Sequence, residues 1–145
     1  MARITQEQKK QISPAIKAVL KEYGMKGTIG IKDYKTLVVN LNAGQLDLLG
    51  ALQKYNDRRA KLFDKKSIKV DGNEQINQYW IVDQMNEIEE NKIAQFYKKL
   101  INAMKSAGWY DKSDCMTDYF DIAYYLSINV GRWDRDYVLQ DKLSA

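Results

Sequence analysis

The stretch YFDIAYYLSINVGRWDRDY, residues 119–137, predicts the strand around which the rest of the chain is organised. From Phe120 to Val130 every second residue is apolar, and most of the intervening residues are polar or aromatic. Because successive side chains of a strand point to opposite faces, this alternation predicts a long half-buried strand over residues 119–130. Gly131 is expected to end the strand or to introduce a bulge.

A helix and then a β-hairpin are predicted at the start of the chain. Thr5 with Gln8 fits a capping box and Ser13-Pro14 fits a second helix start, and either helix would end at Gly24. In the following stretch, KGTIGIKDYKTLVVNLNAG, apolar side chains alternate on both sides of a turn at 33–35. This pattern predicts two hairpin strands.

The middle of the chain has more than one interpretation. Residues 45–66 fit a strand, a helix or a basic loop, with a third strand through 45–49 favoured. The segment QINQYWIV predicts a strand with Ile76, Tyr79 and Trp80 in the core. Asn86 is expected to cap a long helix. The apolar stripe of that helix consists of Ile93, Phe96, Leu100, Ala103, Met104 and Ala107.

The order of these elements predicts an α+β fold in one domain over residues 1–145. We expect an antiparallel sheet of about four to five strands packed against two main helices. The order is helix, two hairpin strands, an optional third strand, a basic segment, a strand, a helix and the last strand. If the last strand lies at the sheet edge, pairing with a second copy would form a homodimer.

The charge of the chain is lopsided, although the net charge is only +4. Residues 1–70 contain 15 Lys and Arg against 6 Asp and Glu, whereas residues 71–145 contain 8 against 13. A basic half favours an anionic partner, nucleic acid above all, unless the two halves complement each other within the fold. The predicted nucleic-acid-binding residues are Lys54, Arg58, Arg59, Lys61, Lys65, Lys66 and Lys69.

The polar face of the last strand is a second candidate binding surface. Aromatic side chains on such a face stack on the bases of single-stranded nucleic acid, at about 1–3 kcal/mol per base. In the alternative interpretation they pack beneath a helix or loop, with an arginine lying on Trp133. The residues of this face are Tyr119, Tyr125, Arg132, Trp133 and Arg135.

The chain is poor in residues that carry catalysis. It has no histidine, and its one cysteine, Cys115, suits a reducing compartment. A carboxylate cluster is the one candidate metal site, but it lacks the glycine and the closing glutamate of a calcium loop. The cluster consists of Asp111, Asp114, Asp118 and Asp121. We therefore predict a protein without catalytic residues, metal or cofactor, and keep a metal-dependent nuclease as a remote alternative.

No apolar run approaches the roughly 20 residues that cross a bilayer, and the N-terminus MARITQEQKKQ has no signal-peptide core. The expected location is therefore the cytoplasm. No membrane partner is expected.

Three segments together resemble one of the large polyvalent protein-associated domain families of bacteriophages and other mobile elements. They are KEYGMKGTIGIKDYKTLVVNLNAGQLD, INQYWI and SDCMTDYFDIAYYLSINVGRWDRDY. The resemblance spans residues 18–137, matches poorly in the basic middle and is most specific at the end. Asp136 departs from it, because this family often has a proline there.

The resemblance implies a phage or mobile-element setting, with the cytoplasm of the bacterial host as the location if the protein is encoded by a phage. It implies no established activity, so no catalytic residue is carried over. The expected function is that of a non-enzymatic accessory protein that binds nucleic acid through its basic N-terminal half. The alternative is a protein-binding inhibitor of a host defence complex, of the anti-CRISPR or anti-restriction type. Many such inhibitors mimic DNA with an acidic surface, and the net charge of +4 argues against that mode.

Overall fold

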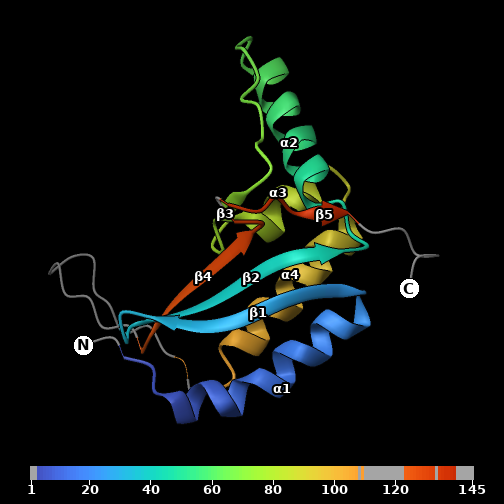
Figure 1. Ribbon diagram of the computed structural model, residues 1–145. Coiled ribbons are helices and arrows are strands. Elements are labelled where there is room, and N and C mark those ends of the chain that lie inside the picture. Colours follow the sequence, from blue (N-terminus) through green and yellow to red (C-terminus); the bar gives the residue numbers. More distant parts are fainter. Residues whose placement is uncertain (1–2, 108, 110–122, 133, 140–145) are drawn as a thin grey trace, which may run out of the picture.

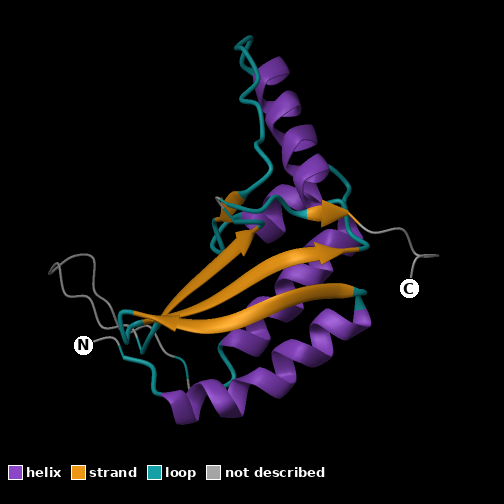
Figure 2. Cartoon of the chain, in the orientation of Figure 1, coloured by secondary structure: helices purple, strands orange, loops and turns teal. Residues whose placement is uncertain are grey.

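The computed structural model describes residues 3–107, 109, 123–132 and 134–139 (Figures 1 and 2). Within them, four helices and five strands form an α+β fold in which one mixed sheet packs against helices, which confirms the predicted fold class. Helices α1 and α4 cover one face of the sheet, and the opposite face turns toward the viewer in Figure 2.

Helix α1 (Gln6–Glu22) begins at the earlier of the two predicted starts. Thr5 Oγ1 accepts the backbone N–H of Gln8 at 3.1 Å, and Gln8 Oε1 accepts the backbone N–H of Thr5 at 2.9 Å. This reciprocal capping box satisfies two amides that the first helical turn leaves without partners. Pro14 therefore lies inside the helix. As predicted, Gly24 terminates the helix, which ends at Glu22 with Tyr23 as its C-cap; the φ of Gly24, +65°, lies in the left-handed region that suits glycine.

The predicted hairpin is confirmed as β1 (Met25–Lys32) and β2 (Thr36–Gly44), which pair antiparallel. Asp33 and Tyr34 in the turn have φ values of 54° and 59°. A turn with two positive φ values matches the right-handed twist of the strands that it joins.

The last strand, β4 (Tyr125–Val130), pairs parallel with β2 from Thr36↔Tyr125 to Leu41↔Val130. The prediction of an antiparallel sheet is wrong at this pair, because the chain between β2 and β4 crosses over through helices before it returns. The short β3 (Glu74–Ile76) pairs antiparallel on the other side of β4. The strand order is β1-β2-β4-β3, and β5 (Val138–Leu139) pairs with the end of β2.

The position of β4 removes the premise of the edge-strand dimer, because β4 lies between β2 and β3. Its predicted inward face is confirmed where the structure describes it, since Leu126, Ile128 and Val130 are buried. The first part of the predicted strand, residues 119–122, lies outside the described residues. Gly131 ends β4 as expected, with a φ of +75°.

The strand predicted over QINQYWIV is wrong beyond Ile76. The side chain of Asn77 accepts the backbone N–H of Tyr79 at 3.0 Å, and this turn leads the chain into α3 (Ile81–Glu87). Ile76 is buried as predicted, but Tyr79 and Trp80 are 61% and 59% exposed. Ile81, on the inner side of α3, occupies a core position instead.

Most of residues 45–66, the segment with three interpretations, forms a helix, α2 (Leu48–Leu62). The prediction of a third strand through 45–49 is wrong. Asp47 caps this helix by accepting the N–H of Gly50 at 3.0 Å. The stripe predicted for the following helix is buried in α4 (Asn91–Met104), except that Ala107 lies beyond its end and is partly buried. The predicted cap Asn86 belongs to α3, because Glu89, with a φ of +62°, separates the two helices.

The core lies between the sheet and helices α1, α3 and α4. Tyr23, beside the end of α1, meets Phe96 of α4 edge to face, with ring centres 5.4 Å apart. Such aromatic pairs contribute about 0.5–1.5 kcal/mol beyond the area that they bury. Among the described helices, none combines the length and apolar character that a membrane crossing requires.

Replacing Ile128 by alanine is expected to lower the free energy of unfolding by about 2–5 kcal/mol, because a fully buried side chain leaves a cavity in the central strand. Urea denaturation measures this change. The control Ile68→Ala, at a side chain that is 75% exposed, should change stability by less than about 0.5 kcal/mol. A loss below about 1 kcal/mol for Ile128→Ala would contradict the central position of β4.

Candidate nucleic-acid interface

A helix and the segment that returns beside it project from the rest of the molecule (Figure 1). Helix α2 is anchored by Leu48 and Ala51, and none of its later residues is buried. The chain reverses near Asp64, whose φ is +49°, and runs back to β3. We call residues 52–73 the basic arm.

Hydrogen bonds from Gln53 join the two halves of the basic arm. Its Nε2 donates to Ser67 Oγ at 3.3 Å and to the carbonyl of Ile68 at 3.2 Å, and its Oε1 accepts the N–H of Val70 at 2.8 Å. Asn56 Nδ2 also donates to the carbonyl of Ile68, at 3.1 Å. Polar contacts along α2 thus join the two halves of the arm.

Asp57 adds a charged acceptor to the same set of contacts. Its carboxylate accepts from Ser67 Oγ and, at 3.0 Å, from Gln53 Nε2. These bonds, that from Ser67 first, hold the pKa of Asp57 below its ordinary value of 3.8. Because the pKa of Asp57 is lower in the folded protein than in the unfolded chain, these hydrogen bonds stabilise the arm at neutral pH. That stabilisation is lost as the pH falls from 3.8 through the pKa of the folded protein.

The structure brings all seven predicted basic residues together on the basic arm, and all seven are exposed. Lys54, Arg58 and Lys61 follow one another at helical spacings of four and three residues, so they form one stripe along α2. Lys54 Nζ lies 3.1 Å from Glu90 Oε1, at the start of α4. The other cations of the arm have no ion pair with another described residue.

A shallow hollow of about 150 Å³ lies near the tip of the basic arm. The guanidinium carbon of Arg59 lies 4.6 Å from the ring centre of Phe63, close enough for a cation–π contact. An apolar floor bordered by cations suits a ligand with both flat apolar and anionic parts. The lining residues are Asn56, Arg59, Ala60, Phe63, Lys65, Lys66 and Ile68.

The second predicted surface is described only in part. Tyr125 is 44% exposed, and strand alternation places it on the sheet face opposite the buried Leu126, which no described helix covers. Arg132 and Arg135 are exposed beyond β4. The backbone N–H of Arg132 donates to the carbonyl of Arg135 at 2.8 Å, and that of Arg135 donates to the carbonyl of Arg132 at 3.0 Å. The other two residues of this surface, Tyr119 and Trp133, lie outside the described residues.

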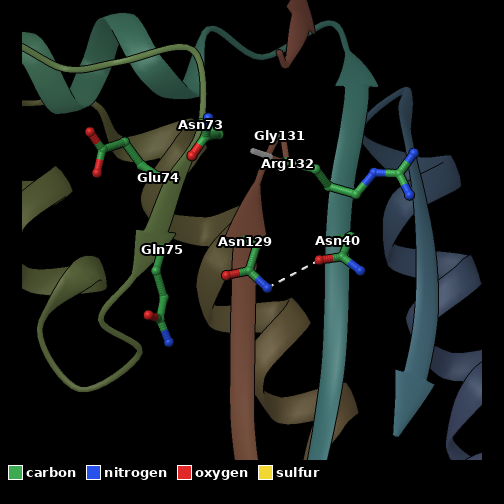
Figure 3. A pocket seen from close by; sticks show the side chains of 7 residues that line it. All are labelled: Asn40, Asn73, Glu74, Gln75, Asn129, Gly131 and Arg132. Carbon is green, nitrogen blue, oxygen red and sulfur yellow. Dashed lines mark hydrogen bonds between the residues drawn. The ribbon is translucent and has the colours of Figure 1, made fainter. Parts of the chain in front are cut away.

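A hollow of about 360 Å³ on the open sheet face was not predicted (Figure 3). At its centre, Asn129 Nδ2 of β4 donates to Asn40 Oδ1 of β2 at 3.0 Å. The sequence did not reveal it, because its residues come from segments that the β2–β4 and β3–β4 pairs bring together. The lining residues are Asn40, Asn73, Glu74, Gln75, Asn129, Gly131 and Arg132.

Within the described part of the chain, no group of three or more acidic or cysteine side chains is arranged to hold a metal ion. The cluster from Asp111 to Asp121, including Asp114, Asp118 and Cys115, lies outside the described residues. Among the described residues, the structure therefore offers no metal site for the nuclease alternative.

No protein-family model matches the chain, and searches of curated proteins and of solved structures find no similar protein. The resemblance to a phage-associated domain family therefore stays a prediction.

Replacing Gln53 by alanine should raise the hydrogen-exchange rate of the Val70 amide at least about tenfold, because this amide loses its acceptor and the return segment loses two further bonds worth about 0.5–1.5 kcal/mol each. Native-state exchange followed by NMR measures this rate. The control is Gln95→Ala, which removes an exposed amide from α4. Unchanged exchange in the return segment would show that Gln53 does not hold the basic arm closed.

Proposed function

We propose that the protein is a non-enzymatic nucleic-acid-binding protein and that the basic arm is its principal contact surface. The observation that carries this proposal is the gathering of seven exposed cations on one projecting element. Lys and Arg side chains that replace the counterions of phosphates supply most of the sequence-independent affinity for nucleic acid. An element that projects from the body reaches a phosphate backbone without a clash from the rest of the fold.

The distribution of ion pairs favours an external anionic partner over internal charge complementarity. If the basic and acidic halves of the chain neutralised each other, ion pairs should connect them throughout the fold. Among the described residues, the basic arm makes one such pair, between Lys54 and Glu90. The other described pair, between Lys99 and Glu22, lies between α4 and α1.

Single-stranded nucleic acid fits the basic arm better than a duplex. The exposed ring of Phe63 lies beside Arg59 and close to Lys65 and Lys66 in the hollow near the tip. An unpaired base can stack on an aromatic ring while nearby cations contact its phosphates, whereas the bases of a duplex stack on one another. The exposed Tyr125 offers a second ring on the open sheet face.

Protein binding is the second candidate function, since Tyr79 and Trp80 are exposed at the start of α3. Tyrosine and tryptophan are enriched among the residues that dominate protein interfaces. This alternative includes the inhibitor of a host defence complex. In either case the resemblance to mobile-element domains supports a phage-type accessory role in a bacterial cytoplasm.

Changing Arg58, Lys65 and Lys66 together to glutamate is expected to weaken the binding of a labelled single-stranded oligonucleotide at least about tenfold in about 50 mM salt. The slope of log affinity against log salt should become shallower by about 2, since each lost phosphate contact removes about 0.7. Fluorescence anisotropy at about 50 and about 200 mM salt measures both quantities.

The matched control changes Lys10, Lys17 and Lys98, three exposed lysines of α1 and α4, to glutamate. It alters the net charge equally, so a general electrostatic effect would weaken binding in both variants. Binding by the wild type that neither responds to salt nor distinguishes the two variants would contradict the proposal and favour a protein partner.

A further inference from the structure

The hollow on the open sheet face lies at the base of the basic arm. The return segment of the arm leads directly into β3, whose residues line one side of the hollow. Its lining contains four carboxamide side chains, one cation, Arg132, and one carboxylate, Glu74. We call this hollow the amide pocket.

The hydrogen bonds of the amide pocket leave donors and acceptors available for a ligand. Asn129 Nδ2 donates to Asn40 Oδ1 at 3.0 Å and also lies 3.5 Å from Ser127 Oγ. Within the described part of the chain, the side-chain oxygen of Asn129 and the side-chain amino group of Asn40 have no further hydrogen-bond partner. The side-chain amides of Asn73 and Gln75 have none either.

The view in Figure 3 shows how these groups face the hollow. The side chains of Asn40 and Asn129 come from neighbouring strands and point toward each other, and Gln75 projects from β3 on the other side of Asn129. The guanidinium of Arg132 lies across β2, away from Gln75. The centre of the amide pocket is thus formed by uncharged groups.

Uncharged donors next to acceptors match the edge of a nucleobase better than they match a phosphate. A phosphate group requires cations or several converging N–H groups, and one arginine at the margin does not supply them. An asparagine or glutamine amide pairs with adenine by accepting from the N6 amino group and donating to the neighbouring ring nitrogen. The volume of about 360 Å³ lies in the range of about 300–1,000 Å³ typical of small-ligand sites.

We propose that the amide pocket holds one unpaired nucleobase, with a preference for adenine, from the single strand that the basic arm binds. This inference rests on the proposed function and adds base selectivity to it. The arm supplies affinity without regard to sequence, and the amide pocket distinguishes one base by its hydrogen-bonding edge. Tyr125 faces the same side of β4 as Asn129, so it provides a stacking surface farther along the same strand.

The test compares oligonucleotides of about 12 adenines and about 12 thymines, a length within the site sizes of about 4–16 nucleotides known for single-strand-binding folds. Fluorescence anisotropy is measured on the wild type and on Asn129→Ala and Gln75→Ala. The wild type should prefer the adenine strand about tenfold or more. Both variants should lose most of this preference and keep the affinity for thymine and the salt dependence.

The second variant, Gln75→Ala, and a control variant separate loss of the amide pocket from loss of the fold. Gln75 is exposed, so Gln75→Ala is expected to fold normally even if Asn129→Ala destabilises the sheet. Gln95→Ala removes an exposed amide from α4 and should keep the adenine preference.

The same measurements distinguish a failure of this inference from a failure of the proposed function. Salt-dependent binding with equal affinity for both strands, or an adenine preference that survives in both variants, would overturn the amide pocket and leave the basic arm supported. The absence of binding to either strand in about 50 mM salt would overturn both.

Discussion

The parallel pairing of β2 with β4 is the constraint on which the rest of the structure depends. Two parallel neighbours cannot be joined by a short turn, so the chain between them must cross from one end of the sheet to the other. The chain uses that crossover for α2, α3, the short β3 and α4. The basic arm is therefore an excursion within the crossover, and the amide pocket exists because the pairing sets Asn40 directly beside Asn129.

The molecule combines an apolar core with an arm held by polar contacts. The core buries one face of the sheet against α1, α3 and α4, whereas the arm depends on the hydrogen bonds of Gln53, Asn56 and Asp57. Exposed hydrogen bonds contribute little net stability, so the arm is expected to open at a lower free energy than the core. Such a low-stability element is suited to adjust to the irregular backbone of a single strand.

The sequence predicted the parts of the fold that local patterns determine. Thr5 and Gln8 indicated the start of α1, and the alternation at Leu126, Ile128 and Val130 indicated the inner face of β4. The predicted antiparallel direction of β4 was wrong. The alternation of apolar residues assigns side chains to the two faces of a sheet and carries no information about the partner strand. The apolar character of Trp80 suggested burial, but the turn at Asn77 exposes it.

The candidate site also has one part that the sequence predicted and one part that it did not. The seven cations were found from sequence because they lie within 16 consecutive positions, from Lys54 to Lys69. The amide pocket was not found, since Asn40 and Asn129 are 89 residues apart in the chain.

A two-dimensional NMR titration of the labelled protein with a single-stranded oligonucleotide tests these binding surfaces most directly. Binding through the basic arm and the amide pocket should shift resonances in the arm and on the open face of β4 and leave α1 unaffected. Shifts confined to α1 and α4 would contradict this mode of binding.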